Sequence, residues 1–280
     1  MTSSEEIRDV QRLTWAELST SWEKWDSIIM HQLSPVGRAI IDSLEISDDQ
    51  QHLDIAAGTG EPGLTVAKLA PRGHVVLTDL APEMLDVASR RANAQGITNF
   101  ETEVCSADDL PFGDATFDSV SVRFGYMFLP DLDKATAEFV RVLKPGGRLC
   151  SSVWVKPEEN PWTTMPMEAI AREAVLAPPD PDGPNMFRCA APGYVGALYE
   201  TAGLHDVVEW DVDVQLVTQS PAQYWEVMSE HVSLTVAALH QIDEPARDRI
   251  AKAVIAQVSK YERDGEVRIP GAARCIVGTK

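Results

Sequence analysis

The chain has 280 residues, enough for one large core or for a core with an added cap. Its 43 Asp and Glu outnumber its 24 Lys and Arg, which gives a formal charge of −19. Such a surface repels phosphate backbones and argues against a nucleic-acid substrate. Because there is no membrane-spanning apolar run and no basic-then-apolar leader, the sequence predicts a cytoplasmic protein.

Residues 4–33 carry apolar side chains three or four positions apart, which predicts a helix, and Ser34-Pro35 is typical of the start of a second helix. We expect residues 1–48 to form a helical cap over the unit that follows. Trp22 and Trp25 lie on the apolar stripe, where packing in the core competes with contact to a substrate.

Between residues 49 and 155, apolar runs of strand length alternate with helical patterns. This order predicts a parallel sheet with right-handed crossovers. We expect strands at about 51–56, 74–79, 100–105, 117–122 and 148–155, and helices at 61–69, from 82 onward and at 132–143.

The segment from residue 156 onward has a different character, because eight of the 18 prolines lie between 156 and 192. We expect an ordered lid with a helix at about 164–176, and then a helix over 192–202. Further along we expect a strand over 205–217, helices at 221–230, 232–241 and 245–261, and a last strand over 271–278. The predicted fold is α/β: a Rossmann-like, seven-stranded, mostly parallel sheet with an antiparallel last strand, a helical N-terminal cap and an inserted lid. The predicted divisions are 1–48, 49–155, 156–265 and 266–280.

The stretch from His52 to Gly63 predicts a strand, a glycine turn and a helix start, which is the entry of a nucleotide-binding unit. Gly58-x-Gly60-x-x-Gly63, with Asp79 at the end of the next strand, also fits a dinucleotide fingerprint. Asp54 argues against that alternative, because a carboxylate beside the turn suits a ligand with an ammonium group better than a pyrophosphate. Asp79 can bind ribose hydroxyls, and the loop after the third strand can reach an adenine.

At this point the chain resembles the class I S-adenosylmethionine-dependent methyltransferases, in the branch that includes quinone and small-molecule methyltransferases. The resemblance covers about 50–155. It rests on Leu53 to Gly60, Thr78 to Leu85, Ala107 to Phe112, Phe117 to Val120 and Arg141 to Leu149. One departure is Ser106, where relatives often carry an acid. An Asn/Asp-Pro-Pro-aromatic motif is absent after the fourth strand, which disfavours adenine or glutamine methylation.

The resemblance implies S-adenosyl-L-methionine as the cofactor and a small-molecule acceptor. No metal is expected, because no His/Cys cluster has the spacing of a structural metal site. The resemblance places the cofactor contacts at the ends of the first four strands: Asp54, Ala56, Gly58, Thr59, Gly60, Asp79, Leu80, Met84, Ser106, Ala107, Asp108, Arg123 and Phe124. Arg123 could alternatively face an anionic acceptor or pair with the acidic 106–114 loop. A homodimer is left open.

Methyl transfer requires alignment of donor and acceptor in a dry pocket, with a general base if the acceptor is a poor nucleophile. The candidate bases are His31, Tyr126 and His231. We expect an apolar chamber for a hydrophobic or aromatic acceptor such as a phenol, a quinone-like ring or a polyketide intermediate. Its expected walls are Trp22, Trp25, Met127, Phe128, Trp162, Met186, Tyr224 and Trp225, with Met165 and Phe187 beside them.

Three other functions remain open from the sequence. An enzyme of this fold can use the same cofactor without methyl transfer, for rearrangement, decarboxylation or hydroxylation. A non-catalytic cofactor-binding subunit and a nicotinamide dehydrogenase are the other two.

Overall fold

The computed structural model describes residues 3–174 and 183–280. The end of the helix expected at 164–176, and the part of the expected lid at 175–182, lie outside the described residues. The strands are β1 (Gln51–Ile55), β2 (His74–Asp79), β3 (Phe100–Val104), β4 (Phe117–Arg123), β5 (Leu143–Trp154), β6 (His205–Thr218), β7 (Glu262–Arg263) and β8 (Glu266–Thr279). The helices are α1 (Ser4–Lys24), α2 (Asp26–Leu44), α3 (Gly63–Leu69), α4 (Pro82–Ala94), α5 (Leu132–Val142), α6 (Pro161–Glu173), α7 (Tyr194–Thr201), α8 (Pro221–His231), α9 (Ser233–Leu239) and α10 (Glu244–Val258), with short 3-10 turns at Tyr126–Phe128, Pro157–Glu159 and Ser259–Tyr261.

The strands form one sheet in the order β3-β2-β1-β4-β5-β8-β6, with the short β7 paired to β8. The first five strands are parallel, and β8 runs antiparallel to both of its long neighbours. This confirms the predicted Rossmann-like sheet with an antiparallel last strand. β1 and β2 are buried along almost their whole length, as expected for parallel strands covered on both faces.

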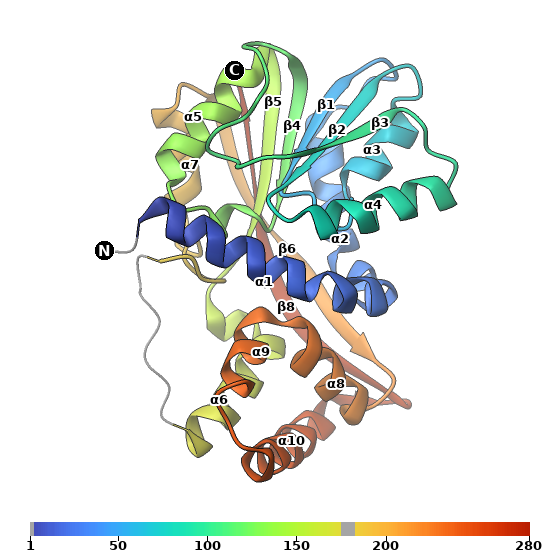
Figure 1. Cartoon of the computed structure of the whole chain (residues 1–280), viewed down its shortest axis with the longest axis vertical. Coiled ribbons are helices and arrows are strands. Elements are labelled where there is room, and N and C mark those ends of the chain that lie inside the picture. Colours follow the sequence, from blue (N-terminus) through green and yellow to red (C-terminus); the bar gives the residue numbers. More distant parts are fainter. Residues whose placement is uncertain (1–2, 175–182) are drawn as a thin grey trace.

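Figure 1 shows α3 and α4 on one side of the sheet, α5 and α7 on the other, and a separate group of helices, α6, α8, α9 and α10, below it. β6 and β8, each 14 residues long, extend from the sheet toward this lower group. α1 lies across the middle of the molecule, between the sheet and the lower helices. α1 therefore lies where it can contact both the strand ends and the lower helices.

The N-terminal cap differs from its prediction at one boundary. The first helix ends at Lys24, and α2 then runs from Asp26 through Pro35, so the expected helix start at Ser34-Pro35 is wrong. A proline inside a helix leaves the carbonyl four residues earlier without its N–H donor. Here the Ser34 hydroxyl donates to the His31 carbonyl at 3.2 Å, and this bond helps the helix to continue.

The break at Trp25 also changes which face of α1 is covered. Val10 and Leu13, both on the expected apolar stripe, are 58% and 59% exposed. α2, in contrast, buries Ile29, Leu33 and Val36 in the main hydrophobic core that also contains the strands. Among the helices of residues 3–174 and 183–280, none combines the length and apolar composition required to cross a membrane.

Candidate functional site

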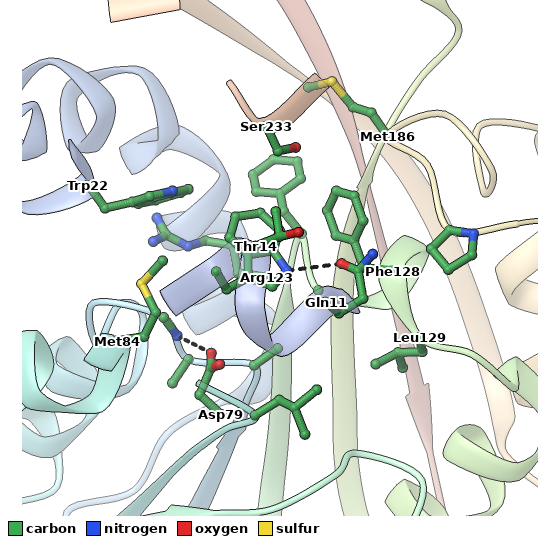
Figure 2. A pocket seen from close by; sticks show the side chains of 18 of the residues that line it. Gln11, Thr14, Trp22, Asp79, Met84, Arg123, Phe128, Leu129, Met186 and Ser233 are labelled. Atoms are coloured by element: carbon green, nitrogen blue, oxygen red, sulfur yellow. Dashed lines mark hydrogen bonds between the residues drawn. The ribbon is translucent and has the colours of Figure 1, made fainter. Parts of the chain in front are cut away.

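A cavity of about 380 Å³ opens at the carboxyl ends of the parallel strands, where sheets of this kind bind ligands. Its lining combines strand ends with α1, the 184–186 loop and the start of α9. Figure 2 shows side chains of both groups around the same space, with Asp79 and Met84 toward one end and Phe128 and Met186 toward another. Of the expected cofactor residues, the lining contains Ala56, Gly58, Thr59, Asp79, Leu80, Met84, Ser106, Ala107, Arg123 and Phe124.

The glycine turn after β1 is shaped from inside the protein by Asp54. This carboxylate is fully buried and accepts hydrogen bonds from the Gly63 N–H at 2.8 Å and from the Ser121 hydroxyl at 2.6 Å. Burial raises the pKa of Asp54 to about 6. Both oxygens are engaged and the residue is absent from the cavity lining, so the structure places Asp54 behind the turn, and its contact with an ammonium group stays a prediction.

Gly60 also lies behind the cavity surface. It has a φ of +103°, a conformation that other residues rarely adopt, and an added Cβ would press on Leu64. Its role in the structure is therefore to shape the turn.

Asp79, at the end of β2, does face the cavity. Its carboxylate accepts hydrogen bonds from the Gly58 N–H and the Ala81 N–H, both at 2.9 Å, so the ends of β1 and β2 are fixed against each other. Burial raises the pKa of Asp79, although these main-chain donors partly offset that effect. A carboxylate held in this way next to a glycine turn suits binding of a ribose diol.

Asp108 forms a buried ion pair that the sequence does not predict. Its buried carboxylate pairs with the Arg8 guanidinium of α1 through Nε at 3.1 Å and Nη2 at 2.5 Å. Burial opposes its ionisation, but hydrogen bonds from Arg8 and Ser106 outweigh this and lower the pKa of Asp108. Asp108 is absent from the cavity lining, its carboxylate fastens α1 across the site, and the adenine contact stays a prediction.

Arg123 and Phe124 follow the fourth strand. Phe124 has a φ of +58°, and its ring stacks on Trp154 with centroids 4.2 Å apart. The Arg123 guanidinium contacts the Met30 sulfur at 3.7 and 3.8 Å. A backbone conformation this unusual for an aromatic residue is typical of functional sites.

The expected acceptor residues divide into two groups. Trp22, Phe128, Trp162 and Met186 line the cavity. Met127 and Tyr224 are fully buried in the core. Trp25 bonds to Glu230, and Trp225 packs against the core, so neither residue lines the cavity. The Tyr224 hydroxyl donates to the Trp162 carbonyl at 2.5 Å, so it supports the cavity wall from behind. Met165 and Phe187 also lie outside the lining.

Only one of the three candidate bases lines the cavity. His31 is exposed and borders a separate hollow near Trp25, and Tyr126 is buried with its hydroxyl paired to Thr136. Burial raises the pKa of Tyr126, so the phenol stays protonated and has no phenolate oxygen to accept a proton. His231 does line the cavity, and its Nδ1 is buried without a hydrogen-bond partner. Burial lowers its pKa to about 3, so the imidazole is neutral.

Several cavity residues are not identified by the sequence. α1 contributes Arg8, Gln11, Thr14 and Trp15, and the start of α9 contributes Ser233 and Leu234. The Gln11 side chain accepts a hydrogen bond from Trp15 Nε1 at 3.1 Å, as Figure 2 shows. The only sequence signal for the α1 group is a tryptophan four positions after a glutamine in a helical pattern, which is too common to indicate a site.

The fold and the strand-end cavity define a class I S-adenosylmethionine-dependent methyltransferase. The sequence profile of the ubiE/COQ5 methyltransferase family matches residues 1–171. The chain therefore belongs to the ubiE/COQ5 methyltransferase family, in which S-adenosyl-L-methionine is the methyl donor and the acceptor is a small molecule.

Curated relatives match over part of their length. A demethylmenaquinone methyltransferase of Thermus thermophilus is 46% identical over 99 residues, which are 35% of this chain and 44% of the relative. The ubiquinone/menaquinone biosynthesis C-methyltransferase UbiE of Brucella anthropi is 44% identical over 101 residues, covering 35% of this chain and 38% of the relative. An uncharacterized protein of Mycobacterium tuberculosis is 35% identical over 156 residues, covering 55% of this chain and 56% of its own. The chain thus spans about half the length of these relatives or less.

Solved structures are similar in fold. The YcgJ protein of Bacillus subtilis superposes with a TM-score of 0.56 at 22% identity, over 87% of this chain and 97% of its own. The [4+2]-cyclase SpnF gives a TM-score of 0.55 at 21% identity, over 88% of this chain and 79% of its own. At these identities the likeness concerns the fold alone.

Proposed function

We propose that this protein transfers a methyl group from S-adenosylmethionine to a small hydrophobic molecule with an aromatic or quinone-like ring, in quinone-like biosynthesis or secondary metabolism. The observation that carries the proposal is the continuity of the strand-end cavity with a chamber walled by aromatic rings. Relatives named as quinone methyltransferases also support a ring-shaped acceptor.

Two rows of rings form the chamber walls. In the first row, Trp15 lies 5.2 Å from Phe128 and 6.4 Å from Trp22, and Trp22 lies 4.4 Å from His231, measured between ring centroids. In the second row, Trp154 lies 4.2 Å from Phe124 and 5.0 Å from Trp162. Ring pairs at such separations attract each other beyond the effect of burial, and a flat ring from a ligand gains the same contacts.

A few polar atoms in the chamber lack partners. Trp22 Nε1, Gln32 Nε2 and His231 Nδ1 are buried without a hydrogen bond and belong to lining residues. Buried polar groups usually have partners, and each one left alone costs about 1–3 kcal/mol. These atoms therefore support an acceptor that carries an oxygen or nitrogen, with the unpaired Nδ1 of neutral His231 as one hydrogen-bond partner for it.

At the strand-end half, the residues fit the cofactor. When bound, it supplies an already activated methyl group. Asp79 is placed to bind the ribose hydroxyls, the turn around Gly58 and Thr59 to contact the methionine end, and Ser106 and Ala107 to contact the adenine. Within the substrate region that we assign to 156–265, the lining residues are Trp162, Pro184, Asn185, Met186, His231, Val232, Ser233, Leu234 and Ala237.

The test is methyl transfer from tritiated S-adenosylmethionine to a panel of acceptors. The panel contains hydroxylated naphthalenes and 1,4-naphthoquinols, with small aliphatic amines and acids as controls. We expect radioactive, more hydrophobic products from the ring compounds, together with release of S-adenosylhomocysteine. Methylation of only the small charged compounds contradicts the aromatic acceptor, and conversion of a ring compound without this release contradicts methyl transfer.

A further inference from the structure

A half-buried cation, Arg123, and a carboxylate, Glu61, line the same cavity without forming an ion pair. The Arg123 guanidinium is held only by the Met30 sulfur, and no carboxylate of residues 3–174 or 183–280 lies within ion-pair distance of it. Buried arginines are normally paired, because an uncompensated charge away from water is costly. An arginine facing a cavity without a partner is suited to an anionic group of a ligand.

Glu61 is the matching acid. It lies in the glycine turn, lines the same cavity, and its side chain is 20% exposed. One carboxylate oxygen accepts from the Thr65 hydroxyl at 2.7 Å, and the other has only a distant cation, Arg91 Nη2 at 4.0 Å. Among the acids, Glu61 acts most strongly on Arg123 through its charge, although burial is the larger influence on that arginine. Arg123 and Glu61 therefore line one cavity with opposite charges and form no ion pair with each other.

We propose that Arg123 and Glu61 together bind the amino-acid end of the cofactor, with Arg123 taking the carboxylate and Glu61 taking the ammonium group. A zwitterion is the ligand whose two charges complement a positive and a negative side chain on the two sides of one gap. The alternative acid, Asp54, is fully buried behind the turn, where it bonds to Gly63 and Ser121, and it does not line the cavity. In Figure 2, Arg123 points toward the end of the cavity where Trp22 and Met84 lie.

The arrangement also explains why Arg91 does not take this role. Its Nη1 donates to the Thr59 carbonyl at 2.8 Å and lies 3.0 Å from an oxygen of Asp26. Arg91 thus fixes the outer side of the turn, while Arg123 is left with nitrogen donors for a ligand. Guanidinium–carboxylate pairs can be bidentate, which also fixes orientation.

The test is calorimetric binding of three ligands to the whole protein, so it does not require an acceptor. S-adenosylhomocysteine has both charges, its deaminated analogue lacks the ammonium group, and 5′-methylthioadenosine lacks both. We expect Arg123→Met to weaken binding of S-adenosylhomocysteine and of the deaminated analogue by about ten- to a hundredfold, the range of a charged hydrogen bond. Binding of 5′-methylthioadenosine should change less than about threefold, within the context-dependence of such contacts.

Glu61→Gln should weaken binding of S-adenosylhomocysteine, whereas the affinity for the deaminated analogue should stay near its wild-type value. Arg123→Lys, which keeps the charge, should recover part of the loss. Arg90→Met is the matched control, because Arg90 pairs with Glu23 on the surface outside the cavity.

Unchanged affinity for S-adenosylhomocysteine in Arg123→Met overturns the proposal, and so does an equal loss for 5′-methylthioadenosine, which indicates a structural role. Either result leaves the aromatic-acceptor proposal intact, because that proposal concerns the other half of the cavity.

Discussion

The two halves of the cavity are built in different ways. In the strand-end half, main-chain groups and short side chains from consecutive strand–helix turns lie close to one another, as with Gly58 and Asp79. In the helical half, the walls come from α1, the 184–186 loop and α9, which are far apart in the sequence. The first half depends on local geometry that a whole family shares, and the second depends on how this chain packs. The difference suggests where cofactor binding ends and acceptor choice begins.

Replacing Asp79 tests the strand-end half and should have the largest effect. Asp79→Ala removes the acceptor for the Gly58 and Ala81 N–H groups and the proposed ribose contact. We expect affinity for S-adenosylhomocysteine to fall at least about a hundredfold, since two charged hydrogen bonds are involved. Calorimetry measures this, with the exposed Asp109→Ala as control. A folded Asp79→Ala variant with wild-type affinity contradicts our placement of the cofactor.

The link between the halves can be broken at Arg8. Arg8→Gln leaves the buried Asp108 carboxylate without its main partner. We expect a loss of about 1–3 kcal/mol in the free energy of unfolding, measured with urea. The ion pair that joins α1 to α4, Arg90 with Glu23, is exposed, so Arg90→Gln should leave stability unchanged. If the two variants lose the same stability, the buried pair does not fasten α1.

The pH dependence of binding tests how Asp54 acts from behind the turn. Burial raises the pKa of Asp54 to about 6, so it gains a proton as the pH falls through that value. The cofactor is positively charged at its ammonium and sulfonium groups and favours the ionised carboxylate, so binding lowers this pKa. Affinity for S-adenosylmethionine should then fall below pH 6, by up to about tenfold per pH unit, and stay level above it. Asp54→Asn should remove this dependence. If the affinity of the wild-type protein does not change between pH 7 and pH 5, cofactor binding is not linked to the ionisation of Asp54.

The smallest expected effect comes from replacing one of the aromatic rings that wall the chamber. Phe128→Leu removes the edge contact with Trp15, for which the rings lie 5.2 Å apart. A contact of this kind contributes about 0.5–1.5 kcal/mol, so KM for an aromatic acceptor should rise roughly three- to tenfold. Affinity for S-adenosylhomocysteine should stay unchanged. Phe112→Leu is the control, because the Phe112 ring packs on Phe117 outside the cavity. A larger effect on cofactor affinity than on KM contradicts the division into two halves.

The strand-end half could be predicted from sequence because its chemistry is tied to strand ends. A run such as His74 to Asp79 specifies a buried strand and the acid that follows, and the sheet brings those ends together. Asp54 shows the limit of this reasoning. The sequence places a carboxylate beside the turn but does not reveal that the Gly63 N–H and Ser121 hydroxyl already occupy it.

The helical half could be predicted only by residue type. Trp22 and Trp25 lie three positions apart, yet one lines the cavity and the other bonds to Glu230, because the helix breaks at Trp25. Aromatic residues at helical spacing suit a core and a ligand wall equally, so Tyr224 and Phe128 cannot be told apart in advance. The pair between Arg8 and Asp108 joins positions 100 residues apart, which local patterns do not reveal.

The attachment of α1 through Arg8 has a practical consequence for how the protein is handled. The same helix supplies Gln11, Thr14, Trp15 and Trp22 to the cavity wall, so a shortened version that starts after it would lack one side of the chamber. A purification tag placed before Ser4 adds chain only ahead of this helix, whereas trimming past Arg8 removes the ion pair with Asp108 while Gln11, Thr14, Trp15 and Trp22 are still present.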